Sequence, residues 1–161
     1  DNSAAEKNLT LEIIRRGIKP ERLIFGERLK RKEYLARYRV ADLFLDTHPY
    51  NAGTTASDAL KMGLPVLTYL GQSYQARMGA SILNSINLPE LITNSMEEYE
   101  ALAIELATNP DQLTKIKDKL HNNLSVAPLF DTPLFTKNLE SAYTQMYERH
   151  QKGLEPDHIY V

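Results

Sequence analysis

The sequence contains no cysteine and no tryptophan, and it has only four histidines in 161 residues. Without cysteine, disulfide bonds and thiolate metal sites are excluded. The histidines are scattered, and no two of them have the H-x-x-x-H spacing of a zinc-binding helix. We therefore expect no metal site and no bound cofactor.

Neither sign of charge is in large excess, and no apolar run is long. The net charge is −2, and no stretch approaches the roughly 18 apolar residues that span a membrane. Nucleic acid and membrane are therefore not expected partners. Hydrophobic residues make up 42% of the chain, which is ordinary for a globular domain. Residue 1 is Asp and no signal-peptide pattern follows it, so we expect a cytoplasmic domain cut from a longer protein.

Short apolar runs alternate with segments of helical periodicity. Strands are expected over residues 22–26, 41–46 and 65–70, and a weaker one over 90–93. Helices are expected over 5–16, 31–39, 54–62, 74–86 and 111–124, from Ser95 onward, and from Thr132 to Gly153. This alternation predicts a Rossmann-like α/β fold, with a parallel sheet, crossover helices and a helical C-terminal portion. Residues 1–153 should form the domain, and residues 154–161 a flexible tail.

A Gly-Thr-Thr sequence follows the strand expected at 41–46. Ligands of open α/β sheets bind outside the carboxyl ends of the strands, where Gly53, Thr54 and Thr55 would begin a helix. Free N–H groups and the helix dipole favour an anion there, and Asp58 lies one turn on, where it could accept hydrogen bonds from a ribose diol. A nucleotide fits this pattern. The alternative is that Thr54 is only a helix cap and Asp58 a solvated acid.

A basic cluster follows the strand expected at 22–26. It contains Arg28, Lys30, Arg31 and Lys32, and Tyr34 offers an aromatic face beside them. Such a loop could grip a base and offset the charge of a phosphate, or it could be a solvated basic loop. No P-loop and no G-x-G-x-x-G motif is present, so neither an ATPase nor an NAD enzyme is indicated.

The stretch "ADLFLDTHPYNAGTTASDALKMGLPVLTYLG" (41–71) resembles the signature of the O-linked N-acetylglucosamine transferase family. Three later stretches resemble the same family in order and spacing: "ARMGASILNSINLPELI" (76–92), "EEYEALAIELATNP" (97–110) and "PLFDTPLFTKNLESAYTQMYERH" (128–150). The resemblance covers about residues 20–153. It implies a GT-B glycosyltransferase, of which this chain would be most of the C-terminal, donor-binding half.

The resemblance also implies a reaction and its substrates. The donor would be UDP-N-acetylglucosamine, the acceptor a protein Ser or Thr hydroxyl, and the transfer inverting and independent of metal. Thr54 and Thr55 match the threonines that hold the diphosphate, and Asp58 matches the acid that holds the ribose. No catalytic residue is assigned in this stretch. The family's acceptor half and the segment that precedes this stretch are not part of it, so we expect the chain alone to be inactive.

The segment from Leu29 to Arg31 matches the part of the family that faces uracil and ribose, with Arg31 at its basic position. Two positions depart from the family pattern: Gly53 and Tyr34 both stand where histidine is common. The sugar could therefore be another hexose, and the acceptor could be a protein Asn. A GT-B transferase or epimerase that acts on small glycans or lipids also stays open, as does a scaffold module whose nucleotide site is vestigial.

Overall fold

The computed structural model describes residues 2–161, which form two compact units divided between Arg37 and Tyr38. The first unit contains α1 (Ser3–Arg15), the short 3-10 helix η1 (Pro20–Arg22) and α2 (Arg31–Arg37). Asn2 begins α1 by accepting hydrogen bonds from the N–H groups of Ala4 and Ala5, at 3.1 and 3.2 Å. Such a cap satisfies N–H groups that the helix itself leaves unpaired.

The strand expected at residues 22–26 is not formed. Residues 23–30 are neither helix nor strand, and the side chain of Ile24 is 85% exposed. An apolar run of strand length becomes a strand only if a neighbouring strand accepts its backbone hydrogen bonds, and the run itself does not reveal whether a neighbour exists. That part of the prediction was wrong.

The second unit is built on a three-stranded parallel sheet. Its strands are β1 (Phe44–Leu45), β2 (Val66–Tyr69) and β3 (Ile92–Thr93), in the order β1-β2-β3. Phe44 pairs with Val66, and Thr68 pairs with Ile92. The α/β fold with a parallel sheet and crossover helices is confirmed.

The helices of the second unit begin and end close to the residues that the sequence indicates. They are α3 (Thr54–Lys61), α4 (Met78–Ser85), α5 (Met96–Thr108), α6 (Pro110–Asn123) and α7 (Thr132–Gln151), with short 3-10 helices η2 (Tyr38–Val40), η3 (Gln75–Arg77), η4 (Pro89–Leu91) and η5 (Pro128–Phe130). Ser95 accepts the Glu98 N–H at 3.1 Å and so caps α5. Gly63 follows α3 with a φ of 84°, a conformation that favours glycine.

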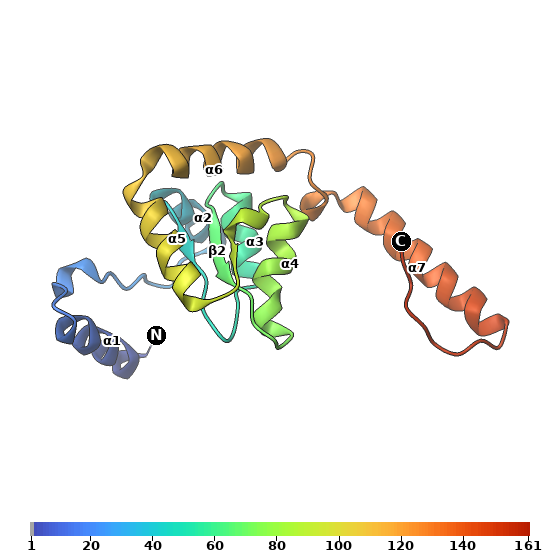
Figure 1. Cartoon of the computed structure of the whole chain (residues 1–161), viewed down its shortest axis with the longest axis horizontal. Helices are drawn as coiled ribbons and strands as arrows, with labels where there is room; N and C mark the ends of the chain where they lie inside the picture. Colours follow the sequence, from blue (N-terminus) through green and yellow to red (C-terminus); the bar gives the residue numbers. More distant parts are fainter. Residues whose placement is uncertain (1) are drawn as a thin grey trace. The chain divides into compact units, whose positions relative to one another are not determined.

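Helices cover the sheet on both sides, and the hydrophobic core lies between them. In Figure 1, β2 lies between α5 on one side and α3 and α4 on the other, and it contacts all three helices; α6 packs on α5. The largest fully buried apolar side chains come from these elements and the segment after α4: Leu60, Val66, Leu67, Leu83, Ile86, Leu88, Leu91, Leu106 and Leu120. This packing fixes α3 against the sheet.

Helix α7 differs from the other α-helices of the second unit because none of its residues is buried. Its apolar side chains are exposed, including Phe135 at 64% and Tyr147 at 65%. Gly153 ends the segment with a φ of 63°. Across residues 2–161, no helix combines the length and the apolar character needed to cross a bilayer.

Candidate functional site

The candidate site lies where β1 and β2 end. The two strands are parallel, so the segments that follow them leave the same edge of the sheet. The first segment is the β1–α3 loop (residues 47–52), and the second leads from β2 to η3. The N–H of Asn51 donates a hydrogen bond to the carbonyl of Gln75 at 3.3 Å, which joins the two segments.

The first turn of α3 is open to solvent at this edge. Gly53 occupies the cap position, and no side chain caps the helix in the described part of the chain. Thr54 and Thr55 are both exposed. The N–H groups of a first turn have no partner within their own helix, and the dipole adds partial positive charge. The structure therefore presents two hydroxyls beside an uncapped helix N-terminus, as an anion site requires.

A cavity of about 300 Å³ opens beside this turn. Its walls come from β1, the β1–α3 loop and the start of α3, and they include Gly53 and Thr55. Gly53 lies close to α4, since a Cβ at this position would lie 3.6 Å from Cγ of Met78. Gly53 and Thr55 therefore line one opening, whereas Thr54 does not line it; that these residues bind a ligand stays a prediction.

Asp58 lies one turn after Thr54 on α3 and is only 7% exposed. It forms part of the helix face that is covered by protein, together with Ala59 and Leu60. Its expected contact with a ribose diol stays a prediction.

Leu29, Arg31 and Tyr34 belong to the first unit. Leu29 is 39% exposed, and Arg31 and Tyr34 lie on α2. The guanidinium carbon of Arg31 lies 5.7 Å from the centre of the Tyr34 ring, a cation–π distance. Such a pair could bind a nucleotide, with the aromatic ring contacting the base and the guanidinium contacting a nearby negative charge. That these three residues share a ligand with α3 stays a prediction.

Sequence reasoning did not single out Tyr50 and Asn51, which also line the cavity. Asn51 is 2% exposed; its amide nitrogen donates to the Thr47 carbonyl at 2.9 Å, and its Oδ1 has no donor among the described residues. Most buried acceptors in folded proteins have a donor, so this oxygen is a group of the cavity wall that could accept a hydrogen bond. The only sequence signal was an Asn in a Pro-containing loop, which more often indicates a turn.

Tyr99 lies on α5, and its side chain contacts the chain just after β1. Its hydroxyl donates to the carbonyl of Asp46 at 2.8 Å. Burial, and next the charge of Asp46, raise the pKa of Tyr99 to about 12, so it stays a neutral hydrogen-bond donor. Among residues 2–161, no group of three or more His, Asp or Glu side chains could hold a metal ion.

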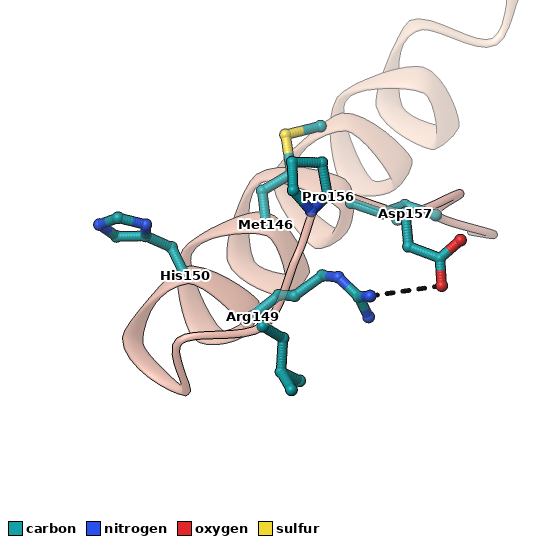
Figure 2. A pocket seen from close by; sticks show the side chains of 7 residues that line it. Met146, Arg149, His150, Pro156 and Asp157 are labelled. Atoms are coloured by element: carbon teal, nitrogen blue, oxygen red, sulfur yellow. Dashed lines mark hydrogen bonds and ion pairs between the residues drawn. The ribbon is translucent and has the colours of Figure 1, made fainter.

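A second cavity, of about 350 Å³, lies between α7 and the residues that follow it (Figure 2). Met146 and Pro156 lie at its apolar wall, and Arg149 forms an ion pair with Asp157 at 3.4 Å and donates to the Glu155 carbonyl. None of the residues expected at the nucleotide site lines this cavity. Residues 154–161 form neither helix nor strand, and their independence as a tail stays a prediction.

The sequence and the fold were compared with those of known proteins. The model of glycosyl transferase family 41 matches residues 2–139. A solved mutant of Thermobaculum terrenum O-GlcNAc transferase superposes with a TM-score of 0.84 at 33% identity, and covers 91% of this chain and 28% of its own.

Two curated relatives extend the similarity along nearly the whole chain. A probable UDP-N-acetylglucosamine–peptide N-acetylglucosaminyltransferase, SEC of Arabidopsis thaliana, is 33% identical over 160 residues, which is 99% of this chain and 16% of the relative. The UDP-N-acetylglucosamine–peptide N-acetylglucosaminyltransferase of Caenorhabditis elegans is 30% identical, over 96% of this chain and 13% of its own length. The chain thus spans a small part of the relatives that it matches. It belongs to glycosyltransferase family 41.

Proposed function

We propose that this chain binds the nucleotide-sugar donor of a protein glycosyltransferase, and that the donor is UDP-N-acetylglucosamine. The observation that carries the proposal is the uncapped N-terminus of α3, where Thr54 and Thr55 are exposed and where Gly53 and Thr55 line a cavity of about 300 Å³. The relatives' names support the choice of donor, because both names specify UDP-N-acetylglucosamine as donor and a peptide as acceptor.

In this proposal α3 holds the diphosphate. The N–H groups of its first turn and the hydroxyls of Thr54 and Thr55 donate to phosphate oxygens. When the acceptor hydroxyl attacks the anomeric carbon, its proton passes to a base that is not assigned to a residue of this chain, the bond from that carbon to the diphosphate oxygen breaks, and UDP gains negative charge. Donors already aimed at that oxygen stabilise the charge as it develops, without a metal ion. The displacement is single, so the configuration of the sugar inverts.

The remaining contacts are proposed for the nucleoside. Tyr34 lies against uracil, Leu29 and Arg31 flank the base and ribose, and Asp58 accepts hydrogen bonds from the ribose diol. The cation–π contact between Arg31 and Tyr34 supports this use of α2. The acceptor is a Ser or Thr hydroxyl of a protein, bound by parts of the enzyme other than this chain.

The identity of the sugar depends on Gly53. A glycine there has no side chain to contact the sugar or diphosphate, where the family pattern commonly has histidine. UDP-glucose and UDP-galactose should therefore be compared with UDP-N-acetylglucosamine in one competition series. N-acetylglucosamine is supported if its nucleotide binds most tightly, whereas a preference for another hexose would transfer the proposal to that donor.

Calorimetric titration of the chain with UDP tests the proposal. We expect saturable binding of UDP and a weaker response to ADP and GDP. Thr114→Ala serves as a control, because Thr114 is an exposed threonine one turn after the start of α6, away from the cavity. Affinity should survive Thr114→Ala and fall on replacing Thr54 and Thr55. If the folded chain showed no saturable binding, the proposal would be refuted, and the chain would be a scaffold module whose nucleotide site is vestigial.

A further inference from the structure

Asp46 is a buried carboxylate directly after β1, and it holds both ends of the β1–α3 loop. Asp46 is only 6% exposed to solvent. One oxygen, Oδ1, accepts the N–H of Thr47 at 2.8 Å and the N–H of Ala52 at 2.7 Å. The first and last residues of the loop are thus joined to a single atom.

The other oxygen ties this carboxylate to the sheet. Oδ2 of Asp46 accepts the hydroxyl of Thr68 on β2 at 2.7 Å, and Thr68 is fully buried. Gly79 of α4 leaves room for the pair, because a Cβ at this position would lie 2.6 Å from Oδ2. Hydrogen bonds to an ionised acceptor are about twice as strong as neutral ones, so the carboxylate is held firmly.

The loop that Asp46 holds leads directly into the start of α3. Within it, the Thr47 hydroxyl donates to the Tyr50 carbonyl at 2.7 Å. Ala52, the residue that Asp46 holds at the far end, is followed at once by Gly53 and Thr54. Core packing holds the body of α3 against the sheet, and Asp46, which does not belong to α3, adds a direct link between β2 and the residues that lead into its first turn.

We propose that Asp46 is a positioning residue for the nucleotide site, acting through the β1–α3 loop and itself oriented by Thr68. This inference rests on the proposed function, since it assigns Asp46 to the site at the N-terminus of α3. Replacing the carboxylate by an amide, in Asp46→Asn, keeps the shape but removes the charge that strengthens the two N–H bonds. Thr68→Val keeps the volume and leaves Oδ2 without its donor.

A merely structural role would lower stability without changing affinity, and Thr93 supplies the control for that case. Thr93 is 4% exposed, and its hydroxyl donates to the Thr68 carbonyl at 3.0 Å. Thr93→Val therefore removes a buried hydroxyl from the next strand without touching Asp46. Thr68→Ser keeps the hydroxyl and should restore what Thr68→Val loses.

The experiment measures melting temperature and UDP affinity for the wild type and these four variants, below the lowest melting transition. Asp46→Asn and Thr68→Val should each weaken UDP binding about fivefold to tenfold, the size expected when one hydrogen bond that orders a site is lost. Thr68→Ser and Thr93→Val should stay within about twofold of the wild type. Wild-type affinity in folded Asp46→Asn and Thr68→Val, or an equal loss in Thr93→Val, would overturn the inference. Tighter binding by Asp46→Asn would also overturn it, by showing that charge repulsion outweighs positioning.

Amide hydrogen exchange gives a second readout that does not depend on the ligand. If the wild type binds no UDP, the proposed function fails, and exchange then decides the inference separately. Asp46→Asn and Thr68→Val should speed exchange at Ala52 and in the first turn of α3, whereas Thr93→Val should not. Unchanged exchange at these amides would mean that Asp46 does not position the loop. If Asp46→Asn does not fold, both UDP affinity and hydrogen exchange are compared between Thr68→Val and Thr68→Ser instead.

Discussion

Replacing Thr54 and Thr55 together by alanine should separate ligand binding from stability. Both hydroxyls are exposed and neither caps α3, so their removal breaks no contact that holds the described fold together. Alanine has the higher helix propensity, by up to about 0.7 kcal/mol per residue. The melting temperature of the double variant should therefore equal or slightly exceed that of the wild type.

The affinity for UDP should fall in the same variant. A hydrogen bond to a charged group contributes about 1.5–3 kcal/mol, and the exposure of this turn favours the lower end of that range. Each lost hydroxyl then weakens binding about tenfold, and the pair about a hundredfold. Some affinity should remain, because the backbone N–H groups and the dipole of α3 are unchanged.

Isothermal titration calorimetry with UDP, paired with thermal melts, makes the comparison. The Ser-Ser variant at the same positions keeps both hydroxyls and should bind within a few-fold of the wild type, and Thr114→Ala should bind normally. If the folded double alanine variant bound UDP as tightly as the wild type, the two threonines would have only a structural part in α3. The assignment of the diphosphate to this turn would then be refuted.

Three further predictions concern the base, the reaction and pH. Tyr34→Ala should weaken UDP, ADP and GDP alike by the 1–3 kcal/mol or so of one stacked base, and Tyr34→Phe should change little; a large drop in melting temperature with normal affinity would instead make Tyr34 a packing residue. The isolated chain should transfer no radiolabelled sugar to protein, because the proposal places acceptor binding in parts of the enzyme other than this chain, and sustained transfer would contradict this. The raised pKa of Tyr99 means that its stabilising effect is complete below pH 10 and is lost as pH rises towards 12. Urea unfolding should thus show a smaller difference between wild type and Tyr99→Phe at pH 11 than at pH 9, and a constant difference would argue against ionisation of Tyr99.

Local signals in the sequence predicted the helices well. Ser95 with Glu98 opens α5 as a capping pair, and Asn109 accepts the Gln112 N–H to open α6. These contacts join residues three apart, so a sequence pattern contains both partners. Gly63 and Gly153 likewise mark chain reversals by their own conformation.

The parts that sequence reasoning missed depend on partners far along the chain. The apolar run at 22–26 has strand composition, but nothing within it says whether another strand pairs with it. Asp46 meets Thr68, which lies 22 residues away, and Tyr99, which lies 53 residues away. No local pattern distinguishes such a buried carboxylate from one that ends a strand in solvent. The seven residues named for the nucleotide site came from local chemistry and resemblance, and their joint contact with a ligand is what the titrations test.

The absence of buried residues from α7 has a consequence for degradation of the chain. A helix of 20 residues without a buried side chain depends on its own hydrogen bonds and propensity, and these are marginal in water. Its local opening should cost far less free energy than unfolding of the sheet. Trypsin should therefore cut α7 at Lys137 or Arg149, or just after it at Lys152, under native conditions, and leave a protected core that contains β2 and α3. Cleavage at these sites would shorten the chain while the threonines of α3 keep their positions.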